Sequence, residues 1–222
     1  MATLQVLETG PMTREVLEGI FASDQDMYPA PLTWERLESW TKAAPEMAIC
    51  FHLPSDEDST GKPVGAVIAL PMLVDSWREL ITGVVKETDV EPTMFPCEDD
   101  HSPEVGLHIF HVERFDVPEA RGRVRGFGNI SMQAVVDAAS RKRWKVLGHS
   151  ALTATPEGRR CFEKLGLSPT SYEEYWVSSA SSDEVQLVTV SVDNASEVDI
   201  SQDRIKGHAR MLAKHISPTD AI

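Results

Sequence analysis

The sequence lacks any apolar run near the roughly 20 residues that a membrane-spanning helix needs. Its start, MATLQVLETGPMTREVLEG, has no basic patch followed by an apolar stretch, so no secretory signal is expected. We therefore expect a cytoplasmic protein without a membrane partner.

Cysteine is scarce. The three cysteines, Cys50, Cys97 and Cys161, are far apart and form no CxxC pair, which leaves zinc and a disulfide framework without support. Reduced thiols in a cytosolic protein are the plain interpretation. His108 and His111 lie three apart on an expected strand and point to opposite faces, so they cannot jointly hold one ion. No metal site is predicted.

Positive charge is in short supply, because 21 Lys and Arg face 35 Asp and Glu for a net charge of −14. Such a surface repels phosphate backbones, so no nucleic-acid partner is expected. The charge is uneven, however. Between Arg114 and Lys145 lie eight basic and three acidic residues. This cationic segment suits a small polyanionic ligand better than a polymer.

Two nucleotide-binding motifs are also missing. No Gly-Lys-Ser/Thr exists for a P-loop, and GFGNIS lacks the third glycine of a dinucleotide fingerprint. The chain does contain strands alternating with helices in the order β-α-α-β-β-(α)-β-α-β-α-β-β. This order predicts a mixed α/β fold in one domain over residues 1–193. For residues 194–222 we expect a C-terminal tail that is either helical or a mobile end.

The stretch RVRGFG, residues 123–128, joins the long expected strand EVGLHIFHVERF to an amphipathic helix. A helix N-terminus presents unpaired N–H groups and partial positive charge, and glycines let a phosphate approach the backbone. Arginines add charge-assisted hydrogen bonds. The junction therefore favours a pyrophosphate, with a flexible corner as the alternative.

Arg123-Val-Arg-Gly126-Phe-Gly128 resembles the [Q/R]-x-x-G-x-[G/A] pyrophosphate loop of the GCN5-related N-acetyltransferase (GNAT) superfamily. FEKLGL, from Phe162 to Leu167, is similar to the later YEKLGF landmark of that family. The resemblance covers roughly residues 2–193. It implies an α/β GNAT fold with a mixed sheet of about seven strands, flanking helices and a cofactor cleft between splayed fourth and fifth strands.

The resemblance also implies acetyl-CoA as cofactor, with the thioester near the middle of HIFHVERF and an oxyanion held by backbone N–H groups of that strand. The residues that would contact coenzyme A are Val112, Arg121, Arg123, Val124, Arg125, Gly126, Phe127, Gly128 and Phe162. Extra residues between Pro118 and Gly126 allow Arg121 to contribute in place of Arg123. The family's usual general-acid tyrosine is replaced by Phe162, which cannot donate a proton.

Glu113 is the first candidate for the catalytic base, because burial of a strand-borne carboxylate favours its accepting a proton. His111 is the second, since it titrates in the useful range. Tyr172 could supply a proton, and His149 and Tyr175 are further candidates. For each, a structural role in the sheet is the alternative.

The predicted function is N-acetyltransferase activity on the amine of a small molecule. The alternative is a catalytically impaired or repurposed GNAT-fold protein that binds coenzyme A or another ligand without acyl transfer. The oligomeric state stays open, a homodimer included, and an exposed last strand would offer a pairing edge.

Overall fold

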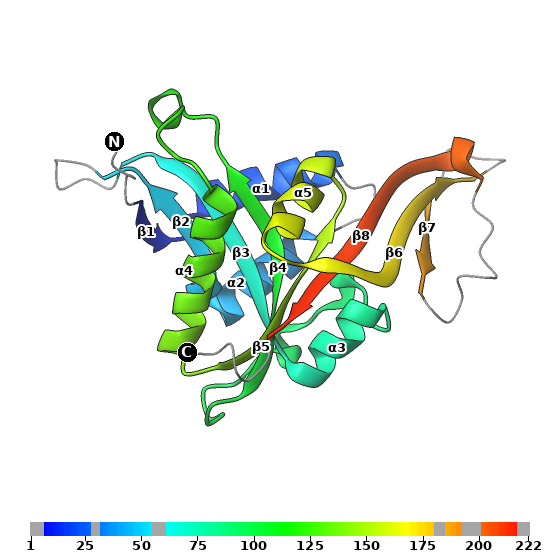
Figure 1. Ribbon diagram of the computed structural model, residues 1–222, viewed down its shortest axis with the longest axis horizontal. Coiled ribbons are helices and arrows are strands. Elements are labelled where there is room, and N and C mark those ends of the chain that lie inside the picture. Colours follow the sequence, from blue (N-terminus) through cyan, green and yellow to red (C-terminus); the bar gives the residue numbers. More distant parts are fainter. Residues whose placement is uncertain (1–6, 28–31, 55–60, 180–184, 192–200, 217–222) are drawn as a thin grey trace.

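The computed structural model describes residues 7–27, 32–54, 61–179, 185–191 and 201–216. In these residues a single eight-stranded sheet has the order β1-β2-β3-β4-β5-β8-β6-β7 (Figure 1). The strands are β1 (Glu8–Pro11), β2 (Ala48–His52), β3 (Pro63–Leu73), β4 (Glu104–Arg114), β5 (Lys145–Thr153), β6 (Ser168–Ser178), β7 (Val185–Val190) and β8 (Ile205–His215). The helices are α1 (Arg14–Met27), α2 (Trp34–Ala43), α3 (Val74–Thr82), α4 (Phe127–Arg141) and α5 (Pro156–Lys164).

The sheet is mixed. β4 and β5 run parallel, and the other neighbouring strands pair antiparallel. Figure 1 shows α4 and α5 in front of the sheet and α1 and α2 behind it, while β6, β7 and β8 extend away to one side. The expected mixed α/β fold with flanking helices is therefore confirmed.

The strand beyond the expected seven is β8. Residues 205–215, where the sequence allowed a helix, form a strand that pairs with β5 on one side and β6 on the other. Arg, Met, Leu, Ala and Lys in this segment favour a helix by intrinsic propensity. Pairing with two open strand edges outweighs that preference, because it satisfies the backbone groups of all three strands.

Two helices begin at a threonine N-cap. Thr33 caps α2 by accepting a hydrogen bond from the Arg36 N–H, and Thr155 caps α5 in the same way through Gly158. Pro156 occupies the first turn of α5, where its missing N–H costs nothing. The buried face of α4 is built from small residues and Val135, which lets the helix lie close to the sheet.

Trp77 of α3 packs across the β4–β5 pair at two glycines that lie opposite each other, Gly106 and Gly148. A Cβ on Gly106 would lie 2.0 Å from Cγ and Cδ2 of the indole, and a Cβ on Gly148 would lie 2.3 Å from Cη2. The indole N–H donates to Ser150 Oγ at 2.8 Å. Only glycine at both positions leaves room for the ring.

Pairing between β4 and β5 ends just beyond this indole, at His108 and Ser150. From there the two strands diverge. On its other edge β4 carries a bulge, because Ile68 pairs with His111 and Ala69 with Ile109, which leaves Phe110 as the extra residue. The fold therefore opens a V-shaped gap beside an irregular segment of β4.

We predict that Gly106→Ala lowers the free energy of unfolding by about 3 kcal/mol, because the added methyl group overlaps the indole of Trp77. Urea unfolding followed by circular dichroism measures the loss. Gly19→Ala is the matched control: nothing lies within 4 Å of its added Cβ, and alanine in α1 should stabilise the protein by about 0.5–1 kcal/mol.

Trp77→Ala should relieve that overlap. The double variant Gly106→Ala/Trp77→Ala is expected to lose about 1–3 kcal/mol less than the sum of the single losses. Strict additivity would contradict the proposed contact.

Candidate functional site

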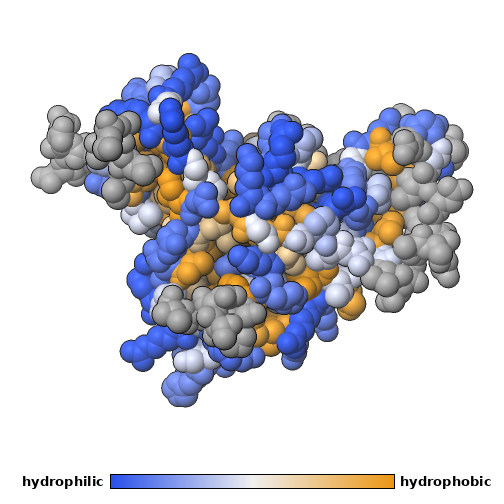
Figure 2. All heavy atoms as spheres, in the orientation of Figure 1, coloured by the Kyte–Doolittle hydropathy of each residue, from blue (hydrophilic) through white to orange (hydrophobic). Residues whose placement is uncertain are grey.

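A cavity of about 390 Å³ occupies the gap where β4 and β5 diverge. We call it the main cavity. Figure 2 shows the corresponding face hollowed between the loop before α4 and α5, with apolar atoms between hydrophilic lobes. The lining comes from five elements and their ends: Ser23, Asp24, Phe110, His111, Val112, Glu113, Phe127, Gly128, Leu152, Thr153, Ala154, Thr155, Glu157, Gly158, Cys161 and Phe162.

The glycine loop ends at the mouth of this cavity. Gly126 is the N-cap of α4 with φ of 65°, a left-handed conformation that other residues adopt at a cost. A Cβ on Gly128 would lie 2.5 Å from Cys161 Sγ, so glycine there allows α4 to approach α5. The N–H groups of the first turn of α4 have no partner within the helix and point toward this region.

A second hollow of about 340 Å³ adjoins the start of α4 and is lined by residues 126–129 and by α5. It adds two cationic side chains, Arg160 and Lys164, that sequence reasoning did not single out. Arg160 also pairs with Glu157 at 2.5 Å. Spacing along α5 was the available signal, because residues 157, 160, 161 and 164 share one helix face.

The arginines of the loop lie outside the main cavity. Arg121 makes a bidentate ion pair with Asp116, with N–O distances of 2.7 and 2.8 Å. Arg123 donates a hydrogen bond to the backbone carbonyl of Glu119 at 3.4 Å. Val124 is buried, and its carbonyl accepts from Arg114 at 3.3 Å. Arg125 is exposed.

The structure thus brings four of the predicted cofactor residues to the main cavity, Val112, Phe127, Gly128 and Phe162. Gly126 joins them at the second hollow. Arg121, Arg123, Val124 and Arg125 line neither hollow.

His111 and Glu113 lie together on the wall of the main cavity, with Nε2 and Oε2 3.2 Å apart. The hydrogen bond from His111 lowers the pKa of Glu113, and this effect outweighs partial burial. The expected burial-raised carboxylate is therefore not found at Glu113.

Tyr172 lies away from the main cavity. Its hydroxyl donates to Glu174 Oε1 at 2.6 Å, and burial together with that carboxylate raises the pKa of Tyr172 far above its usual value. Tyr175 donates to Glu173, and burial raises its pKa to about 12. His149 is buried, which lowers its pKa to about 4.

A buried polar chain runs beneath the end of the β4–β5 pairing. His108 contacts Ser150 Oγ through Nδ1 at 2.9 Å and Glu87 Oε1 through Nε2 at 2.6 Å. Burial lowers the pKa of His108 to about 3 and raises that of Glu87 to about 8. At neutral pH the pair is uncharged, so the protonated carboxyl of Glu87 donates a hydrogen bond to Nε2, and Nδ1–H donates one to Ser150 Oγ.

Beside this chain lies a small cavity of about 30 Å³, which we call the acidic pocket. Three carboxylates line it: Asp24 of α1, Glu87 of the turn Glu87–Asp89, and Glu174 of β6. None of the three was a sequence candidate. A signal existed for Asp24, because it continues the buried stripe of Val16, Leu17 and Ile20 at helical spacing.

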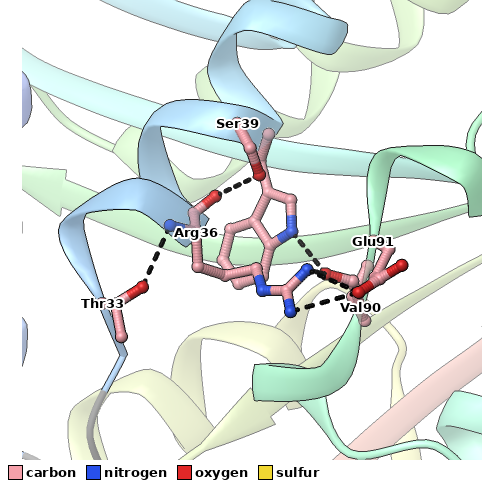
Figure 3. A network of polar contacts seen from close by, with 6 residues as sticks. Thr33, Arg36, Ser39, Val90 and Glu91 are labelled. Atoms are coloured by element: carbon pink, nitrogen blue, oxygen red, sulfur yellow. Dashed lines mark hydrogen bonds and ion pairs between the residues drawn. The ribbon is translucent and has the colours of Figure 1, made fainter.

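The segment that carries Glu87 is attached to α2 (Figure 3). The Val90 carbonyl accepts from Trp40 Nε1 at 2.8 Å and from Arg36 Nη1 at 3.2 Å, and Arg36 also pairs with Glu91 at 3.4 Å. Trp40 forms part of the wall of the acidic pocket. Glu87 and Thr88 of this segment line the acidic pocket.

Among the described residues, no helix is long and apolar enough to cross a membrane.

We predict that Glu87→Gln flattens the dependence of stability on pH. A carboxyl whose pKa is raised from 4.5 to about 8 stabilises the fold below pH 4.5, and that contribution is lost as the pH rises through 8. Gln keeps an N–H donor for His108 but does not titrate. Urea unfolding at pH 5 and pH 8 measures the free energy of unfolding. Between these pH values the wild type should lose about 3 kcal/mol more of it than the variant does.

Glu15→Gln, on the exposed side of α1, is the control and should follow the wild type. Equal pH dependence in wild type and Glu87→Gln would contradict a protonated, buried Glu87.

No family model matches the chain, and the search of curated proteins finds no match. Solved structures do match. Arabidopsis thaliana NAA60 in complex with acetyl-CoA shares 11% identity at a TM-score of 0.55, over 95% of this chain and 100% of that one. The structure of the NatC complex bound to Gag peptide and CoA shares 9% identity at a TM-score of 0.51, over 95% of this chain and 99% of that one.

Ard1 from Thermoplasma volcanium gives 12% identity and a TM-score of 0.50, over 95% of this chain and 98% of that one. At these identities the likeness shows a shared fold. The fold of this chain is that of the GCN5-related N-acetyltransferase superfamily.

Proposed function

We propose that the protein is an acyl-CoA-dependent N-acyltransferase, using acetyl-CoA and acting on the amine of a small molecule. The observation that carries the proposal is the main cavity, which opens where β4 and β5 diverge and meets the N-terminus of α4. The structural neighbours add support, since NAA60 was solved with acetyl-CoA and NatC with CoA.

The residues at hand fit coenzyme A. Gly126 and Gly128 leave the first turn of α4 open, and its free N–H groups suit a pyrophosphate. Lys164 and Arg160 add positive charge at the same hollow. Val112 and Phe162 give the main cavity apolar walls for a pantetheine arm. Bound there, the cofactor would supply the acyl group as a thioester.

The bulge at Phe110 supplies a second element of the reaction. The extra residue takes a backbone N–H out of the β3–β4 ladder, on a segment that lines the main cavity. A backbone N–H fixed in this way can stabilise negative charge that develops on the acyl oxygen.

Proton handling falls to the polar groups of the cavity wall. His111 and Glu113 are the proposed proton acceptors, His111 the better placed because the lowered pKa of Glu113 makes it a weaker base. For Tyr172 to act as the proposed proton donor, its hydroxyl must break its hydrogen bond to Glu174 and turn to a group in the main cavity. Thiols have a pKa near 8.5, so the departing thiolate tolerates the absence of a general acid.

A second candidate function is cofactor binding without transfer. It rests on Phe162, which is buried, lines the main cavity and stands where the related enzymes carry a tyrosine. Thiol release from acetyl-CoA over a panel of small amines separates the two. Binding of coenzyme A without thiol release for any amine would favour this second function.

We predict that Gly126→Ala weakens coenzyme A binding about tenfold in isothermal titration. The added methyl group strains the left-handed backbone and lies where the pyrophosphate would approach the N–H groups of α4. Gly122→Ala is the matched control, because Gly122 has a similar φ of 73°, no neighbour within 4 Å of an added Cβ, and no place in either hollow.

Both variants should lose about 1 kcal/mol of stability through backbone strain. If the Gly126→Ala and Gly122→Ala variants bind coenzyme A with equal affinity, the glycine loop is not part of the binding site.

A further inference from the structure

The acidic pocket adjoins the main cavity at the bulge of β4. Asp24, Phe110 and Leu152 line both spaces. A group in the acidic pocket therefore lies next to the segment of β4 that the proposed reaction uses. The two spaces adjoin along this shared wall, between the α4 N-terminus and the three carboxylates.

Asp24 has no partner for its charge. Asp24 is 6% exposed, and its carboxylate makes no hydrogen bond or ion pair with any residue that the structure describes. The other two carboxylates are engaged, Glu174 by Tyr172 and Glu87 by His108. Burying an unpaired carboxylate destabilises a fold, and a ligand cation would compensate the charge.

We propose that the acidic pocket binds the amine end of the acceptor, and that Asp24 pairs with a primary ammonium group carried on an unbranched carbon. This inference rests on the proposed function and names its acceptor class: small aliphatic amines of the form R–CH₂–NH₃⁺.

The size of the pocket selects the unbranched form. Its 30 Å³ holds about two water-sized groups, enough for an ammonium and one methylene. An amine on a branched carbon, such as a peptide N-terminus, is too wide. The rest of the wall is mostly apolar and suits a methylene chain: Leu32, Trp40, Phe110, Leu152, Trp176 and Leu187, with Thr88.

The surrounding charges favour a cation. Burial and the neighbouring Glu87 raise the pKa of Asp24 to about 6, with His111 of β4 opposing them. Burial and Glu87 also raise the pKa of Glu174 to about 7, against Tyr172 and Lys86 and together with Asp89. The neighbouring side chains of α2, β5 and β7 in the pocket wall, Trp40, Leu152 and Leu187, are uncharged.

Asp24 is also suited to take a proton. At pH 7 to 8 its carboxylate is mostly ionised and can accept one proton from R–NH₃⁺, which leaves R–NH₂ with its lone pair free and Asp24 as the neutral acid. The proton then passes to the proposed acceptors His111 and Glu113 on the wall of the main cavity, which Asp24 also lines. Asp24 is in this sense a catalytic residue, because it contacts the reacting nitrogen.

The test is isothermal titration of n-butylamine into the full-length protein at pH 7.5, beside sec-butylamine and n-butanol. We expect n-butylamine to bind at least tenfold more tightly than sec-butylamine, and n-butanol to give no heat. Asp24→Asn should weaken n-butylamine at least tenfold, whereas Glu15→Gln, an exposed change on the same helix, should leave it unaltered. Equal binding of the two butylamines, or unchanged binding to Asp24→Asn, overturns the proposal.

A lysine side chain carries the same chemistry. Titration of Nα-acetyl-lysine methylamide distinguishes a free small amine from a protein lysine. Tighter binding of n-butylamine supports a free small amine. At least tenfold tighter binding of the lysine derivative overturns the small-amine acceptor in favour of a protein lysine.

Two further measurements keep the result interpretable. Asp24→Asn should raise the thermal midpoint at pH 8, because it removes an unpaired buried charge; should it fail to fold, Glu174→Gln is titrated in its place and is expected to lose n-butylamine binding at least threefold. Coenzyme A is titrated separately. If the wild type does not bind coenzyme A, the proposed function is wrong. The n-butylamine titration would still show whether the acidic pocket binds an amine.

Discussion

The contact between Trp77 and the glycine pair Gly106 and Gly148 governs the centre of the molecule. It holds β4 and β5 together at one end through a ring that no other residue pair would admit. Its indole N–H fixes Ser150, and Ser150 fixes His108, at the last paired position of the two strands. Beyond that point no pairing holds β4 and β5, and the main cavity occupies the space between them. The cavity is therefore a consequence of where the strands are clamped.

Opposite charges are concentrated at the two ends of this opening. Toward the start of α4 lie free backbone N–H groups with Arg160 and Lys164. Toward α1 and β6 lie three buried carboxylates. This separation suits a reaction in which an anionic cofactor and a cationic acceptor approach one reactive centre from two sides, and each charged group raises the local concentration of its own ligand. The bulge at Phe110 lies between them.

Local signals were sufficient for the parts of the site that depend on backbone conformation. Gly126 and Gly128 at a strand-to-helix junction predicted the loop before α4. Residues whose roles depend on partners were harder to predict. Arg121 is bound to Asp116 and Tyr172 to Glu174, and neither pairing leaves a trace in the spacing of the residues. β8 was missed because its propensity and its pairing disagree.

The sequence by itself determined the alternation of strands and helices, the glycine loop, the basic segment and the replacement of a tyrosine by Phe162, since each is a property of neighbouring residues. Only the tertiary structure decided which carboxylates are buried together. Asp24, Glu87 and Glu174 come from three elements far apart in the chain. Their proximity follows from how α1, β6 and the segment after α3 pack on the sheet, because burial and like charge act through space and not along the chain.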